Sequence, residues 1–152
     1  MIAPKEILDL LKSTESYRVE RTTSTGNMDK FCEAICAFSN DMPGSRKNGY
    51  LIIGASDDGS IAGMRVDDAL LKKIAGIRSD GNILPLPTMS VERFPFPEGD
   101  LLVAEVRPSD LPPVRYRSRT FIRVGLRRDI ATEAEERILA ERRCSFMATF
   151  DA

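Results

Sequence analysis

Three carboxylate side chains occupy sequence positions that folding could bring close together. Glu15 and Glu20 are five residues apart, and Asp57 follows the apolar run from Tyr50 to Ile53. That run has the composition of a buried strand, and the rigid end of a strand can aim the Asp57 carboxylate. Converging carboxylates bind Mg²⁺ or Mn²⁺, which can position a water and stabilise charge on a phosphate. We therefore expect at least two of these carboxylates to lie within about 8 Å of each other.

The turn after the apolar run determines where Asp57 points. Asp58-Gly59 is a typical hairpin sequence, because both central residues of a type I′ turn have positive φ. A second short strand is then expected from Ile61. Two alternatives stay open for the carboxylates. Asp57 could be a turn residue that bonds the backbone, and an arginine such as Arg18 or Arg21 between the carboxylates would make them a structural ion-pair network.

A second feature that could bind a ligand is a run rich in arginine. Residues 115–128 hold six arginines and no acidic residue: Arg115, Arg117, Arg119, Arg123, Arg127 and Arg128. If residues 115–119 form a strand, the first three guanidinium groups share one face. Arginine binds phosphate in a bidentate manner and stays charged, so the run indicates a surface for phosphate or nucleic acid. The alternative is a charged strand edge that prevents aggregation.

Composition excludes several classes of chemistry. The chain has no histidine, which removes Ser-His-Asp and Cys-His catalysis and most zinc sites. Its three cysteines do not have zinc-finger spacing, and Cys32 and Cys36 would lie on one face of a helix. No apolar run has the roughly 18 residues of a membrane span, and the N-terminal sequence lacks the apolar block of a signal peptide. A cytoplasmic protein without a membrane partner is expected.

Helical and strand patterns alternate along the chain. Apolar spacing and capping signals predict helices at residues 4–12, 28–40, 68–78 and 133–143. The capping residues are Asn27, Asp67 and the pair Thr132 and Glu135. Strands are predicted at residues 17–21, 50–53, 89–94, 101–106 and 120–124, and a proline-stiffened loop at residues 82–87.

These elements predict one α+β domain over residues 1–143, with a mixed, mostly antiparallel sheet and helices packed mainly on one face. Residues 50–53 should lie inside the sheet with Phe31, Ile35 and Phe38 packed on them, because consecutive apolar residues suit a strand covered on both faces. Residues 144–152 are expected to be a tail or a linker to a C-terminal module. A homo-oligomer and such an effector module both stay open.

Several motifs together resemble one known family. They are Glu15-Ser16, Val19-Glu20, the helix end Ala37-Phe38-Ser39-Asn40, the strand Gly49-Tyr-Leu-Ile-Ile-Gly54 with Asp57, and Phe121-Ile-Arg-Val-Gly125 followed by Ala131-Thr132 and Glu135. In this order they resemble the Schlafen AlbA_2 domain over most of the chain. The sequence departs from the family pattern at Glu20-Arg21-Thr22, where an aromatic residue and a lysine usually follow the glutamate, and in the stretched segment Asn40–Gly49.

The resemblance implies a nucleic-acid-binding domain of a bacterial or archaeal transcriptional regulator, with DNA or RNA as partner and no cofactor needed for binding. In the animal Schlafen branch a three-carboxylate site supports metal-dependent cleavage of RNA, which by resemblance would fall on Glu15, Glu20 and Asp57 with Mg²⁺ or Mn²⁺. A metal-dependent endoribonuclease is therefore one alternative function. A ligand-sensing or dimerisation module is another.

Overall fold

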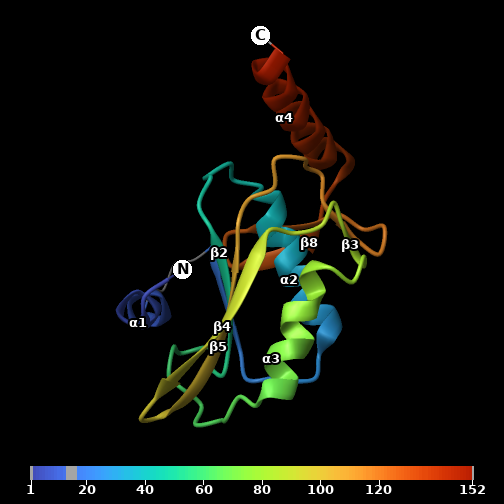
Figure 1. Cartoon of the computed structure of the whole chain (residues 1–152). Coiled ribbons are helices and arrows are strands. Elements are labelled where there is room, and N and C mark those ends of the chain that lie inside the picture. The colour runs from blue at the N-terminus through green and yellow to red at the C-terminus, as the bar shows by residue number, and fades with distance from the viewer. Residues whose placement is uncertain (1, 13–16, 152) are drawn as a thin grey trace.

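The computed structural model describes residues 2–12 and 17–151, with side chains as far as residue 144. A four-stranded sheet forms the middle of the domain, in the order β1-β2-β5-β4 (Figure 1). Its strands are β1 (Val19–Thr22), β2 (Gly49–Ile53), β5 (Gly99–Val106) and β4 (Met89–Phe96). Strand β1 pairs parallel with β2, and the other pairs are antiparallel. The prediction of a mixed, mostly antiparallel sheet in an α+β domain is confirmed.

Both faces of the sheet are covered, which explains the uninterrupted apolar run in β2. Leu51 and Ile53 pack in one cluster with helices α2 (Met28–Asn40) and α3 (Asp68–Ala75). Tyr50 and Ile52 pack in a second cluster with helix α1 (Pro4–Lys12) on the opposite face (Figure 1). All five residues of β2 are buried. The expected packing of Phe31, Ile35 and Phe38 over this strand is confirmed.

Side-chain caps begin three of the helices as the sequence predicts. The Asn27 side chain accepts a hydrogen bond from the Lys30 amide, and the Asp67 side chain accepts one from the Leu70 amide. A 3₁₀ turn (Gly76–Arg78) follows α3. Thr132 and Glu135 form a reciprocal capping box at the start of helix α4 (Glu133–Asp151), each side chain accepting from the other's amide.

Two small antiparallel sheets complete the domain. Strand β3 (Ile83–Leu84) pairs with β6 (Arg115–Tyr116), and β7 (Phe121–Val124) pairs with β8 (Arg127–Ile130). The loop expected at residues 82–87 therefore contains a short strand, and β8 was not predicted. Both errors concern strands without the apolar run or alternation by which a strand is recognised in sequence.

The C-terminal helix is longer than predicted. Helix α4 continues from Arg143 to Asp151 and extends away from the sheet (Figure 1). The prediction that this helix ends at about Arg143 is wrong, because residues 144–151 contain no glycine or proline to end a helix. None of the helices among the described residues has both the length and the apolar character needed to cross a membrane.

Candidate functional site

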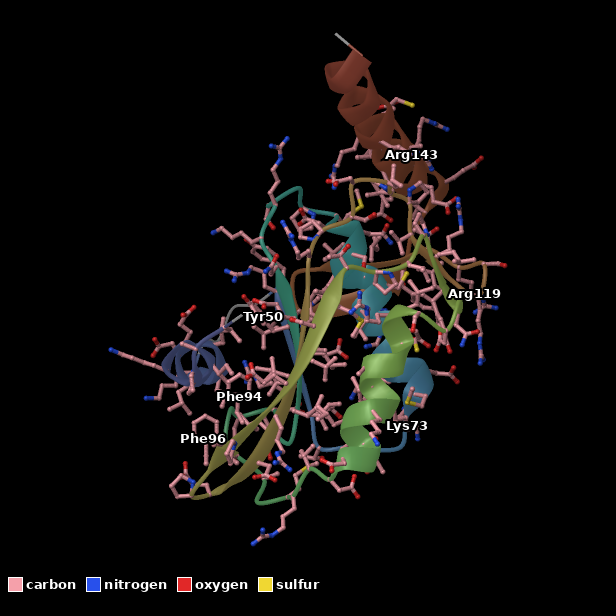
Figure 2. The ribbon with its side chains drawn as sticks, viewed as in Figure 1. Tyr50, Lys73, Phe94, Phe96, Arg119 and Arg143 are labelled. Carbon is pink, nitrogen blue, oxygen red and sulfur yellow. The ribbon has the colours of Figure 1, made fainter. Side chains whose placement is uncertain are left out.

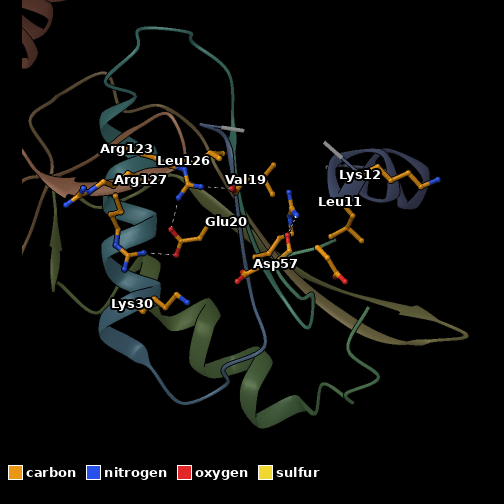
Figure 3. A pocket seen from close by; sticks show the side chains of 12 residues that line it. Leu11, Lys12, Val19, Glu20, Lys30, Asp57, Arg123, Leu126 and Arg127 are labelled. Atoms are coloured by element: carbon orange, nitrogen blue, oxygen red, sulfur yellow. Dashed lines mark hydrogen bonds and ion pairs between the residues drawn. The ribbon is translucent and has the colours of Figure 1, made fainter. Parts of the chain in front are cut away.

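Glu20 is the centre of a buried ion-pair network. The Glu20 Oε1 atom accepts a 2.7 Å hydrogen bond from Arg123 Nη1, and its Oε2 atom accepts one of 2.7 Å from Arg128 Nη1 (Figure 3). Arg123 also donates to the Val19 carbonyl at 2.8 Å, and Arg128 Nε lies 3.4 Å from a Glu33 oxygen. The network thereby joins β1 to α2 and to the β7–β8 hairpin.

Burial determines the electrostatics of this network. The side chains of Glu20 and Arg123 are 11% and 8% exposed. Burial lowers the pKa of the Arg123 guanidinium, and the charge of Glu20 opposes that shift. An arginine remains protonated under such conditions, so Arg123 is a buried cation that depends on Glu20 for its counter-charge.

A cavity of about 640 Å³ adjoins the network along β1, the edge strand of the sheet. Helix α1 contributes to one side of it, and the β7–β8 hairpin contributes to the other (Figure 3). Among the described residues, its lining contains six basic and three acidic side chains, whose charges sum to +3: Lys12, Arg21, Lys30, Arg123, Arg127, Arg128, Glu20, Asp57 and Asp58. A concave site with this excess of positive charge attracts anions.

Asp57 lies at the cavity in a turn whose type differs from the prediction. The Gly59 amide donates to the Ser56 carbonyl, and only Gly59 of the expected pair has positive φ. The loop is therefore a three-residue turn that ends in a left-handed glycine, rather than a type I′ turn. The strand expected from Ile61 is reduced to a single bridge between Ala55 and Ile61.

The surroundings of this turn fix its backbone while the Asp57 side chain is exposed. Arg21 Nη1 donates to the Asp57 carbonyl at 2.8 Å (Figure 3). A Cβ at Gly59 would collide with the Leu11 carbonyl at the end of α1, so the turn packs directly under that helix. Asp58 accepts from the Ser60 hydroxyl and amide, and these hydrogen bonds lower the Asp58 pKa.

The expected acidic trio has three different outcomes. Glu15 lies outside the described residues. Glu20 and Asp57 both line the cavity, but Glu20 is held by two arginines. Glu20 is therefore part of an ion-pair network, as the alternative proposed, and it pairs with Arg123 and Arg128. The alternative named Arg18 or Arg21 for this role. Arg18 Nε donates to the Asn48 carbonyl at 3.1 Å.

The described carboxylates do not fit a cation site in this arrangement. Among the side chains described, those of residues 2–12 and 17–144, no three acidic or cysteine groups lie together so that they could hold a metal ion. Both Glu20 oxygens already accept from guanidinium groups at 2.7 Å, and a cation would compete with these two arginines.

The six arginines of residues 115–128 divide into two groups. Arg123, Arg127 and Arg128 line the cavity. Arg115, Arg117 and Arg119 lie beyond it, and Figure 2 shows Arg119 on the side of the molecule away from α1.

The prediction that these last three share one strand face is wrong. Arg117 and Ser118 have positive φ and form a two-residue turn between Tyr116 and Arg119. Arg115 pairs with Glu136 at 3.4 Å, and Arg117 pairs with Asp29 at 3.5 Å. Both pairs are exposed and contribute little to stability.

Sequence reasoning missed two kinds of residue. Lys12, Lys30 and Leu126 line the cavity but carry no local signal, because the segments that hold them are far apart in sequence. Asn40 is recognised in the sequence only as the last residue of the motif Ala37-Phe38-Ser39-Asn40. It is buried, and its side chain donates to the Val114 and Phe121 carbonyls and accepts from the Val114 amide. Asn40 thus fastens the end of α2 to the segment that leads into β7.

The comparisons with known proteins agree with this fold. The family model described as Schlafen, AlbA_2 matches residues 15–132. No curated protein sequence matched the chain.

Two solved structures are similar to the chain. One is the solution NMR structure of the N-terminal domain of a protein from Nitrosomonas europaea named for its relation to the ATP-dependent DNA helicase RecG. It is 22% identical with a TM-score of 0.60, over 88% of this chain and 92% of that one. The other is the crystal structure of the DIP2311 protein from Corynebacterium diphtheriae, 21% identical with a TM-score of 0.54, over 86% of this chain and 29% of that one.

Proposed function

Because the chain belongs to the Schlafen AlbA_2 family, we propose that it is a nucleic-acid-binding domain that holds phosphates at the cavity along β1. The observation that carries the proposal is the excess of basic side chains among the described residues around that cavity, six against three acidic ones. Phosphate contacts from lysine and arginine supply most of the affinity in non-specific nucleic-acid binding. Such binding needs no cofactor.

The cavity cations come from separate elements, which gives them a fixed arrangement. Lys12 ends α1, Lys30 lies in the first turns of α2, and Arg127 begins β8. Lys30 Nζ lies 3.4 Å from the Thr22 hydroxyl, and the Arg127 side chain is 84% exposed. An exposed guanidinium on a rigid strand is well placed to contact phosphate.

We propose that the arginines beyond the cavity extend the same interface. The ion pairs of Arg115 and Arg117 are exposed, so a phosphate can replace them at small cost. Arg117→Ala and Arg119→Ala should then weaken the binding of a long probe but leave a probe of about six nucleotides unaffected, since a short strand fills only the cavity. If both variants bind the long probe as tightly as the parent protein does, the interface is confined to the cavity.

The finer role that we propose is DNA binding within a bacterial or archaeal transcriptional regulator, in the cytoplasm, with an effector module after α4. A relative named for a DNA helicase supports DNA as one partner. The contacts of Glu20 favour binding over metal-dependent RNA cleavage, since its two oxygens already balance Arg123 and Arg128.

The test is a salt series of fluorescence-anisotropy titrations with labelled DNA and RNA. Lys30→Ala and Arg127→Ala should each weaken binding to all sequences alike and reduce the slope of log K against log salt by about one unit. Lys73→Ala is the matched control, because Lys73 is an exposed lysine on α3, away from the cavity (Figure 2). Unchanged slopes in both cavity variants would refute the proposal.

A further inference from the structure

Leu126 is an exposed apolar side chain at the cavity. It is 66% exposed and belongs to the cavity lining, in the β7–β8 turn directly before the cations of β8. The other apolar lining residues, Leu11 and Val19, are only 3% exposed and belong to the core. Among the described lining residues, Leu126 is therefore the one that offers exposed apolar surface to a ligand.

The turn sequence explains this exposure. Val124 pairs with Arg127, so Gly125 and Leu126 are the two central residues of the β7–β8 hairpin. Gly125 has a φ of 62°, whereas Leu126 is not among the residues with positive φ. This is the pattern of a type II′ turn, which places glycine first. The tight turn holds Leu126 beside Arg127, so apolar and cationic groups adjoin in a rigid frame.

An apolar group beside cations distinguishes between forms of nucleic acid. A duplex presents phosphates on its outside and keeps its bases stacked inside, so packing a base on an apolar side chain in the lining would require the duplex to be unstacked, at a cost in free energy. An unpaired base has an exposed face that packs on apolar or aromatic side chains while its phosphates contact basic ones. The cavity volume of about 640 Å³ falls in the range of small-molecule sites, which suits one nucleotide unit.

We propose that the cavity takes an unpaired nucleotide of a single-stranded nucleic acid, with its base packed on Leu126 and its phosphates on Lys12, Lys30 and Arg127. This inference rests on the proposed function and narrows the expected partner to nucleic acid with unpaired nucleotides: single strands, loops or unpaired ends. The three cations lie on α1, α2 and β8 around the cavity, so the backbone of the strand passes between α1 and the β7–β8 hairpin (Figure 3).

The experiment uses the full chain and two labelled probes, a 12-nucleotide single strand and a 12-base-pair blunt duplex of the same mixed sequence. Leu126→Ala should raise the Kd for the single strand about fivefold and leave both its salt slope and the Kd for the duplex unchanged. Leu126→Phe should lower the Kd for the single strand, because an aromatic ring stacks on a base. Leu86→Ala is the control, since Leu86 is 52% exposed and lies outside the cavity lining.

The outcomes separate the two proposals. Equal loss of single-strand and duplex binding in Leu126→Ala, or no loss at all, would overturn the inference while the nucleic-acid function stands. Salt-independent or absent binding of both probes would overturn the function as well. Light scattering on the same samples tests self-association: a dimer that Leu126→Ala dissociates would assign Leu126 to a contact between copies and overturn the inference.

Discussion

The Glu20 carboxylate accepts a 2.7 Å hydrogen bond from Arg123, although 103 residues separate them in sequence. Both side chains are buried, so the pair ties the edge strand β1 to β7 and holds one wall of the cavity. Arg128 binds the other oxygen of the same carboxylate. The position that resembles a metal ligand in sequence therefore acts as a counter-charge for two arginines.

Removal of Glu20 should destabilise the domain strongly. In Glu20→Ala the Arg123 cation stays buried without this carboxylate, and the free energy of unfolding should fall by about 3–5 kcal/mol, as for other broken buried ion pairs. Urea denaturation followed by circular dichroism measures the change. Glu33→Ala is the control: Glu33 is 27% exposed and lies 3.4 Å from Arg128, so its loss should cost less than about 1 kcal/mol. Similar costs for the two variants would contradict the structural role of Glu20.

Gly49 should be intolerant of any side chain. A Cβ at Gly49 would overlap the Phe38 ring, and this contact lies between β2 and α2 in the core. Gly49→Ala should therefore lower the free energy of unfolding by about 1–3 kcal/mol through overpacking, measured by thermal or urea denaturation. Gly26→Ala is the control, because a Cβ there meets no atom within 4 Å. Phe38→Ala removes the two nearest atoms of the clash, Cγ and Cδ1, so Gly49→Ala should cost less in that background than in the parent; an equal cost in both would show that the clash is not its cause.

The sequence was sufficient to predict most of the fold because the fold depends on local patterns. The apolar run at residues 50–53, the helix caps at Asn27 and Asp67, and the capping box of α4 are each recognised from a few neighbouring residues. The prediction that the arginines of residues 115–119 share one strand face was wrong because a tight turn interrupts this segment. Arg117 and Ser118 are outside the residue types that usually mark a tight turn with positive φ.

The site was less predictable because its residues meet only after folding. No local signal in sequence assigns Glu20 to Arg123 and Arg128 rather than to a metal, since the choice depends on how the β7–β8 hairpin packs against β1. The same holds for Asn40, whose hydrogen bonds reach 74 and 81 residues along the chain. The number of arginines could be counted from the sequence. Which of the six line the cavity and which lie on the outer surface could be known only from the topology of the fold.

The three thiols should differ in reactivity and in their effect on stability at high pH. Burial raises the pKa of Cys32 to about 11 and that of Cys36 to about 12, from an ordinary value of 9.0, whereas Cys144 is exposed. One thiol should therefore react rapidly with a disulfide reagent in the folded protein at pH 8, and three should react in urea.

A raised folded pKa also makes stability depend on pH. The unfolded chain loses these thiol protons first, so the stabilisation is complete below pH 9 and is lost as the pH rises toward about 12. Between pH 8 and 10.5 the free energy of unfolding should fall less in Cys36→Ala than in the parent, by about 1–2 kcal/mol. Cys144→Ala should keep the slope of the parent. Identical slopes in all three proteins would show that Cys36 is not desolvated.

Asp57 distinguishes the binding function from the nuclease alternative, because the two assign it opposite effects. Its carboxylate is exposed at a cavity that otherwise attracts anions. If the cavity binds phosphate, Asp57→Asn removes a repulsive charge and should lower the Kd for a labelled single strand about two- to fivefold at low salt, with less effect at high salt. Glu98→Gln is the control, since Glu98 is exposed and lies outside the cavity lining.

The same proteins are incubated with structured RNA and Mn²⁺ to test for cleavage. Mn²⁺-dependent cleavage by the parent that Asp57→Asn abolishes would establish the nuclease instead, whereas tighter binding without cleavage would leave Asp57 as a residue that limits the affinity of the cavity for nucleic acid.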